Sequence, residues 1–101
     1  MAEDPPGRRR TAKLEIQMDD DVAQGMYINL CMVHHDENEF TIDVMYAPPH
    51  RRRARIRARI ISSPKHTKRL VHALQEQIGR YEERYGTIDV TGPNPADRLL
   101  H

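Results

Sequence analysis

Six arginines lie within nine positions, residues 51–59, and these side chains offer the clearest chemistry in the sequence. From Arg55 to Arg59 the arginines alternate with Ile and Ala. Because successive side chains of a β-strand point to opposite faces, the alternation predicts a strand with one apolar face and one row of positive charge. A guanidinium donates hydrogen bonds to carboxylate and phosphate oxygens, so acidic side chains and phosphates are its natural partners.

Three interpretations of the arginine row stay open. In the first, the arginines pair with acidic side chains of the same chain, such as Glu15 and Asp43, on a solvated face. In the second, they pair with acids across a subunit interface. In the third, they bind the phosphates of a nucleic acid. The candidate residues for nucleic acid are Arg8, Arg9, Arg10, Arg51, Arg52, Arg53, Arg55, Arg57 and Arg59. A formal net charge of only +1 weighs against this third interpretation, since nucleic-acid-binding domains are usually strongly basic.

Other chemistry is not indicated. His34 and His35 are adjacent, so on a strand they point to opposite faces, and the remaining histidines show no spacing typical of a zinc site. Cys31 stands alone in an apolar segment, where we expect a buried, reduced thiol. Without a phosphate-binding loop or a nucleophile motif, the sequence predicts no catalytic residue, no metal site, no cofactor and no enzymatic activity.

The elements that must position these residues can be read from hydrophobic periodicity. Period-two alternation predicts strands at residues 13–18, 26–34, 40–46 and roughly 52–61. Ser63 and Pro64 predict a helix start, and Gly86 predicts its stop after Tyr85. The apolar stripe of this helix is formed by Leu70, Leu74, Ile78, Tyr81 and Tyr85.

Together these elements predict an α+β fold, a four-stranded antiparallel sheet followed by one long C-terminal amphipathic helix packed on one face (β-β-β-β-α). We expect residues 1–12 to be a disordered basic tail, residues 13–88 a single domain, and residues 89–101 a mostly disordered tail. The helix should cover the even-numbered residues of the strands. These are Leu14, Ile16, Ile28, Leu30, Ile42, Val44, Ile56 and Ile60.

A single helix leaves the opposite, odd-numbered face of the sheet uncovered, and that face mixes apolar and charged residues. Such composition is typical of protein interfaces. The candidate interface residues are Tyr27, Val33, Met45, Ile61, Arg55, Arg57 and Arg59. Gly79, inside the helix, is either a tolerated exposed glycine or a point where another backbone packs closely.

The overall composition suits a small interaction protein. The 101 residues contain no apolar segment that resembles a signal peptide or a membrane span, so we expect a cytoplasmic protein. A domain of this size is often marginally stable without a partner subunit. We therefore expect a non-enzymatic homo-oligomeric binding or interaction protein, with a nucleic-acid-binding protein as the alternative.

Ordered blocks of residues also resemble a family of small bacterial and archaeal proteins catalogued as a domain of unknown function. The blocks are Val22–Gly25 with Tyr27 and Asn29, His35 with Glu39, Phe40 and Asp43, Arg59–Pro64, Lys68–Leu70, Ala73 and Leu74, Arg80–Glu82, and Tyr85 with Gly86. The resemblance covers about residues 13–88 and implies a compact α+β domain without an established activity. The strand order is also similar to that of the SecB export chaperones, which would imply the binding of extended polypeptide on an assembled sheet.

Overall fold

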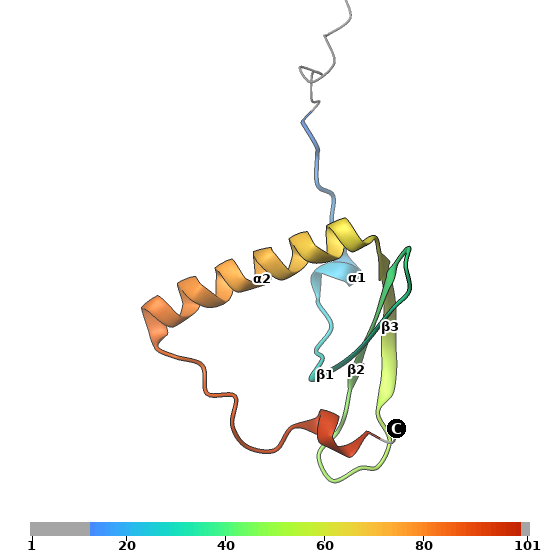
Figure 1. Ribbon diagram of the computed structural model, residues 1–101, viewed down its shortest axis with the longest axis vertical. Helices are drawn as coiled ribbons and strands as arrows, with labels where there is room; N and C mark the ends of the chain where they lie inside the picture. Colours follow the sequence, from blue (N-terminus) through green and yellow to red (C-terminus); the bar gives the residue numbers. More distant parts are fainter. Residues whose placement is uncertain (1–12, 100–101) are drawn as a thin grey trace, which may run out of the picture.

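The computed structural model describes residues 13–99, in which a small antiparallel sheet carries a long projecting helix (Figure 1). The elements, in chain order, are α1 (Asp20–Ala23), β1 (Leu30–His35), β2 (Phe40–Tyr46), β3 (Arg55–Ser62), α2 (Pro64–Tyr85) and the 3-10 helix η1 (Pro95–Arg98). The sheet order is β1-β2-β3. The α+β class is confirmed, but the prediction of four strands is wrong, because residues 13–18 lie outside the sheet.

A tight hairpin joins β1 and β2. The Asp36 carboxylate accepts hydrogen bonds from the backbone N–H groups of Asn38 and Glu39, at 2.7 and 2.9 Å, and so closes the loop. Its closure places His35 opposite Phe40 and Leu30 opposite Met45. Strand β2 has the predicted bounds, whereas β1 begins only at Leu30, four residues later than predicted.

The hairpin register overturns the predicted faces of the sheet. Because His35 lies opposite Phe40, each odd-numbered residue of β1 shares a face with even-numbered residues of β2. A bulge between Val44 and Met45 shifts β3 as well, so that Ile56 lies opposite Met45. The face that we name the apolar sheet face contains Cys31, Val33, His35, Phe40, Ile42, Val44, Tyr46, Arg55, Ala58, Ile60 and Ser62. The mixed sheet face contains Leu30, Met32, His34, Thr41, Asp43, Met45, Ile56, Arg59 and Ile61.

Helix α2 has the bounds that the sequence predicts. The Ser63 side chain accepts a hydrogen bond from the His66 N–H at 3.2 Å, and Pro64 occupies the first turn, where no intrahelical donor is needed. Gly86 ends the helix with φ at +99°, a conformation that glycine adopts without a steric cost.

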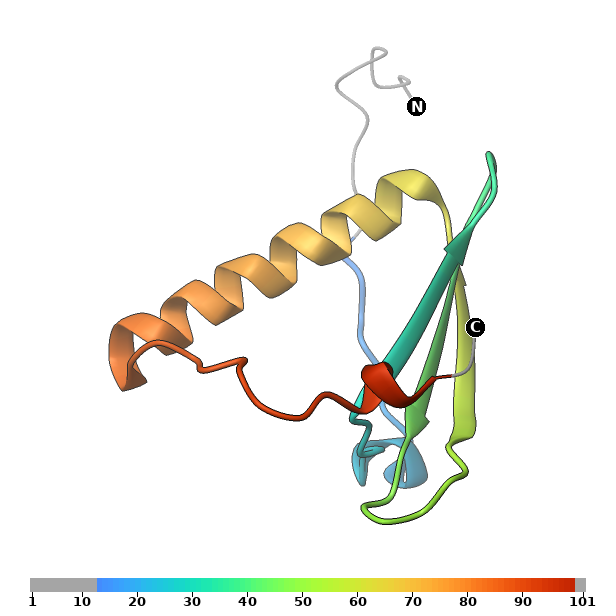
Figure 2. The ribbon, with the colours of Figure 1, turned by 60° about the horizontal axis from the view of Figure 1, so that its bottom comes forward.

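The predicted packing of α2 on the sheet is wrong. The helix leaves the end of β3 and projects away from the strands, and none of its residues is buried (Figures 1 and 2). Only Ser63 separates β3 from α2, a connection shorter than the about two to six residues usual between a strand and a helix that packs on its sheet.

The core lies on the mixed sheet face, at the end of the sheet distant from α2. Leu30, Met45 and Ala47 form it, and the partly buried Met32, Ala96 and Leu99 pack against them. The chain returns after α2 to place η1 beside β1 (Figure 2). Within this segment Asn94 caps η1 by accepting from the Ala96 N–H at 3.0 Å. A mostly disordered tail at residues 89–101 stays a prediction. No helix within residues 13–99 is both long enough and apolar enough to cross a membrane.

Candidate functional site

The N-terminal segment, residues 13–18, is the first of three uncovered apolar surfaces. Its alternating pattern predicts a strand, but it belongs to no helix or strand in the structure. Leu14 and Ile16 are 92% and 91% exposed, and Met18 is also exposed. Three large apolar side chains, one at every second position, are therefore exposed to solvent and gain little free energy from burial.

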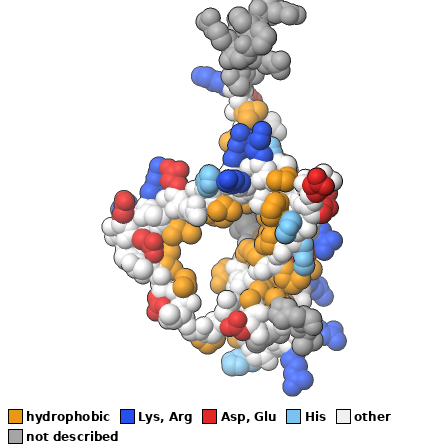
Figure 3. Space-filling view, viewed as in Figure 1, with side chains coloured by type: hydrophobic (Ala, Val, Ile, Leu, Met, Phe, Trp, Pro, Cys, Tyr) orange, Lys and Arg blue, Asp and Glu red, His pale blue; other side chains and the backbone are white. Residues whose placement is uncertain are grey.

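The apolar stripe of α2 is the second uncovered surface. Its residues are Leu70, Val71, Leu74, Ile78, Tyr81 and Tyr85, whose exposed fractions run from 44% to 66%. Figure 3 shows an opening between α2 and the sheet, with hydrophobic side chains along both of its sides. An amphipathic helix normally buries such a stripe, so the chain by itself leaves the helix without its packing partner.

The apolar sheet face is the third uncovered surface. Val33 and Ile60 are about half exposed, at 56% and 46%, although most side chains of their face are apolar. Cys31 lies on the same face and is exposed. The prediction of a buried thiol is therefore wrong for the single chain, because α2 projects away from the sheet and leaves Cys31 exposed.

The arginine row is partly neutralised within the chain. Arg59 forms a bidentate ion pair with Asp43 on the neighbouring strand, Nε to Oδ1 at 2.8 Å and Nη2 to Oδ2 at 3.1 Å. These hydrogen bonds, assisted by the charges of Arg59 and His34, lower the pKa of Asp43 against the opposing effect of desolvation. The same hydrogen bonds raise the pKa of Arg59. Pairing within the chain, the first interpretation of the arginines, therefore holds for Arg59.

Arg57 has a different role from Arg59. It lies at the β-bulge, and its Nη1 donates to the backbone carbonyl of Tyr27 at 2.9 Å. This bond ties the segment before β1 to the far strand of the sheet. Arg55, opposite Tyr46, is exposed.

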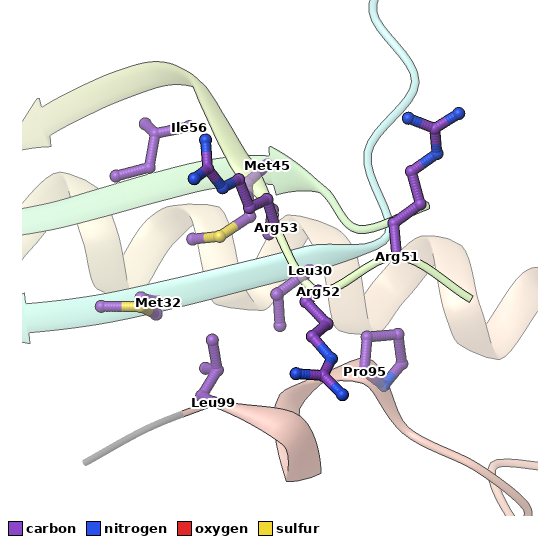
Figure 4. Close-up of a pocket in the computed structure, with 10 residues that line it drawn as sticks. Leu30, Met32, Met45, Arg51, Arg52, Arg53, Ile56, Pro95 and Leu99 are labelled. Carbon is purple, nitrogen blue, oxygen red and sulfur yellow. The ribbon is translucent and has the colours of Figure 1, made fainter. Parts of the chain in front are cut away.

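A groove with an apolar floor and arginines at its rim lies beside the core (Figure 4). Its volume is about 600 Å³, and its lining residues are Leu30, Met32, Met45, Arg51, Arg52, Arg53, Ala54, Ile56, Pro95 and Leu99. Arg52 extends toward Pro95 and Leu99, whereas Arg53 lies beside Ile56 and Met45. The groove can accommodate an apolar group and hold an attached anion at its rim.

The candidate interface residues do not share one face. Met45 is only 3% exposed and belongs to the core, whereas Ile61 is exposed on the same mixed sheet face. Val33 lies on the apolar sheet face. Tyr27 lies before β1 and is exposed, with its ring edge-on to Tyr46 at 5.8 Å between centroids. Arg8, Arg9 and Arg10 lie outside the described residues.

Sequence reasoning missed the C-terminal contribution to the groove. Pro95 and Leu99 line it, although both belong to a segment that we expected to be mostly disordered. A signal that could have indicated it is the pair of leucines at positions 99 and 100, near the end of the tail.

Comparison with known proteins identifies a family. The family model described as "Protein of unknown function (DUF3467)" matches residues 1–90. It confirms the resemblance that the ordered sequence blocks indicate. No curated protein and no solved structure matches the chain, so the analogy to the SecB chaperones finds no support.

Proposed function

The chain belongs to the DUF3467 family, and because the description of that family states no activity, we propose a function from the geometry. We propose that the protein is a non-enzymatic, cytoplasmic, homo-oligomeric binding protein, in which a second copy covers the apolar surfaces of the first. The observation that carries this proposal is the apolar stripe of α2, which has no buried residue.

The energetic argument rests on how little the single chain buries. Its buried hydrophobic residues within the described part are Leu30, Val44, Met45 and Ala47. Folding must offset the conformational entropy of the chain mainly by burying apolar surface, and so small a core leaves a domain of this size marginally stable by itself. Covering the half-exposed stripe residues of α2 would contribute on the order of 1 kcal/mol for each side chain.

A second copy is the partner that best fits these surfaces. The chain carries a helix with an exposed apolar stripe and a sheet with an exposed apolar face, and each needs a surface of the other kind. In a dimer with a two-fold axis, α2 of each copy can cover the apolar sheet face of the other. Two-fold symmetry is the commonest symmetry of homodimers. A heterologous partner would have to supply both surfaces itself.

The groove supplies the binding role of the assembled protein. Its floor is built from the core residues Leu30 and Met45, so it exists within each copy and does not depend on the interface. Arg52 and Arg53 at its rim favour a ligand that joins an apolar group to a carboxylate or phosphate. We assign this groove binding only, without a catalytic step.

Light scattering of the purified chain at micromolar concentration tests the oligomer. We expect a mass of at least two chains, unchanged on moderate dilution, because the surfaces to be covered are apolar. A mass of one chain at that concentration would refute the proposal.

Nucleic-acid binding is the second candidate function, and the exposed run of Arg52, Arg53 and Arg55 favours it. Two other members of the row, Arg57 and Arg59, already donate hydrogen bonds within the chain. A phosphate-binding surface would make affinity for a mixed oligonucleotide fall steeply with salt.

A charge-reversal comparison tests this second function. The test variant changes Arg52, Arg53 and Arg55 to Glu, and the control changes Lys65, Lys68 and Arg69 of α2 to Glu, which reverses the same number of exposed charges. If the two variants bind the oligonucleotide equally, the arginine run is not a nucleic-acid site.

A further inference from the structure

We propose that the N-terminal segment, residues 13–18, is a strand donated in trans, which pairs with the exposed edge of β3 in the second copy. This inference rests on the proposed homo-oligomer and names the contact by which it forms. The resulting sheet in each half of the assembly would have four strands, three from one chain and one from its partner.

The segment has the properties of a strand that lacks its sheet. Leu14, Ile16 and Met18 alternate with Lys13, Glu15 and Gln17, as a strand with one buried face requires. In the structure the segment runs away from its own sheet (Figure 1), and Leu14 and Ile16 are more than nine-tenths exposed. Addition of the segment to a sheet edge would pair its free backbone donors and acceptors. It would also give its apolar side chains neighbours on the same face.

The sheet offers two edges, β1 and β3, and their side chains differ. On the mixed sheet face, β1 presents Leu30, Met32 and His34, and η1 already packs beside this strand. The polar row of the donated segment would therefore lie next to the apolar Leu30 and Met32. Edge β1 is the poorer match, because its row has no arginine to pair with Glu15 and η1 already lies beside it.

Edge β3 is the better match for the donated segment, because its row on the mixed sheet face includes an arginine. On the apolar sheet face it presents Ala58 and Ile60, beside which Leu14 and Ile16 would extend the apolar surface. On the mixed sheet face it presents Ile56, Arg59 and Ile61, so that one charged residue stands in the row. The Arg59 side chain is 60% exposed although it pairs with Asp43, so it can take Glu15 as a second carboxylate.

The same pairing enlarges the surface that α2 has to cover. A fourth strand beside β3 adds Leu14, Ile16 and Met18 to the apolar sheet face. A helix of 22 residues is about 33 Å long, which is enough to cross a sheet of four strands. Strand donation and helix covering are thus parts of one interface.

Disulfide trapping in the full-length chain tests the pairing. With Cys31 replaced by alanine, Ile61→Cys on β3 is combined with Lys13→Cys in one variant and with Gln17→Cys in another. With Glu15 beside Arg59, the first pair becomes adjacent in an antiparallel arrangement and the second in a parallel one. The controls carry the same N-terminal cysteines with His34→Cys on β1. A disulfide forms only where the Cα atoms lie within about 7 Å, so each pair reports a specific neighbour.

The expected result is a linked species of twice the chain mass for one of the two Ile61→Cys variants and for neither His34→Cys control. An intramolecular link, a link to His34→Cys, or no link in a protein that light scattering shows to be oligomeric would each overturn strand donation. The last outcome leaves the proposed homo-oligomer standing. A monomeric wild-type mass would instead refute the oligomer itself.

Amide hydrogen exchange is a second test of the strand pairing, and it needs no introduced cysteine. Ile16→Asp should speed amide exchange in β3 severalfold while β1 stays unchanged, because only β3 loses its neighbour. Gln17→Asp introduces the same charge one position along, on the polar row, and should leave β3 protected. Equal exchange of β3 in both variants would contradict the pairing.

Discussion

Arg59 closes over Asp43 from the neighbouring strand and holds it by two hydrogen bonds of 2.8 and 3.1 Å. Asp43 is only 1% exposed, which makes it the most buried polar side chain of the described residues. A buried carboxylate is costly unless it is paired, and a bidentate guanidinium is the geometry that satisfies it best. Arg59 therefore stabilises the folded chain by pairing with this carboxylate.

Acid should remove the contribution of this pair to stability. Because its hydrogen bonds with Arg59 lower the pKa of Asp43 in the folded chain, its stabilisation is fully present above the ordinary value of about 3.9 and is lost as the pH falls through the lower folded value. Asp43→Asn should lower the thermal midpoint near neutral pH, and the gap to the wild type should narrow below about pH 3.9. Thermal melts followed by circular dichroism, recorded for both proteins across this pH range, measure the difference in thermal midpoint. A gap that stays constant down to the most acidic buffer would contradict the assignment.

Asn29 fastens the start of β1 to the end of β2. Its side-chain amide donates to the carbonyl of Ala47 at 2.9 Å and its side-chain oxygen accepts from the Ala47 N–H at 2.8 Å. Asn29→Ala leaves both backbone groups without these partners and should lower the free energy of unfolding by about 1–3 kcal/mol. Urea titration measures the loss. Asn38→Ala, in the exposed hairpin loop, is the control and should change it by less than about 0.5 kcal/mol.

Local signals made some elements predictable from sequence. The bounds of α2 follow from Ser63, Pro64 and Gly86, each of which acts on its own turn of backbone. Strand β2 follows equally from its own alternation, and Asp43 could be named as an arginine partner because charge and spacing suggest it.

Other features depend on contacts that spacing does not reveal. The hairpin loop sets the register of β1 against β2, and a change of one residue exchanges the two faces, so Leu30 came to share a face with Met45. The groove depends on Leu99 reaching the core from a distant part of the chain. Within one chain, residues 13–18 do not join the sheet and the apolar stripe of α2 does not pack on it. The proposed second copy would provide the missing contacts of both.

Gly79 should tolerate a side chain. A Cβ added there would meet no atom within 4 Å, and the residue is exposed. Gly79→Ala should therefore raise the free energy of unfolding by up to about 1 kcal/mol, through helix propensity alone, and leave the oligomer mass unchanged. Urea titration and light scattering check the two statements. A destabilised or dissociated variant would show that another backbone packs against this face of α2, which is the alternative that the sequence left open.

The thiol of Cys31 should report the covering of the apolar sheet face. It is exposed in the single chain, so a monomer would react rapidly with a thiol reagent. In the proposed oligomer the same face is covered, and the reaction should be slowed by at least about tenfold, since it must wait for local opening. The rate in the native protein is compared with that in urea. Equal rates, after correction for the effect of urea on the reagent, would mean that the face is open.

The central claim is that the apolar stripe of α2 is an interface between copies. Leu74 lies within the stripe, whereas His72 lies on the polar side of the same helix, and both are exposed in the single chain. Leu74→Glu and His72→Glu introduce the same side chain two residues apart. Burying an unpaired carboxylate costs several kcal/mol, which raises the dissociation constant by more than about a hundredfold.

The most direct measurement is light scattering of these two variants and the wild type, all at the same micromolar concentration, which gives the mass of each. We predict that His72→Glu keeps the oligomeric mass of the wild type and that Leu74→Glu has the mass of a single chain. Oligomers of equal mass for both variants would contradict the claim that the stripe of α2 joins the copies.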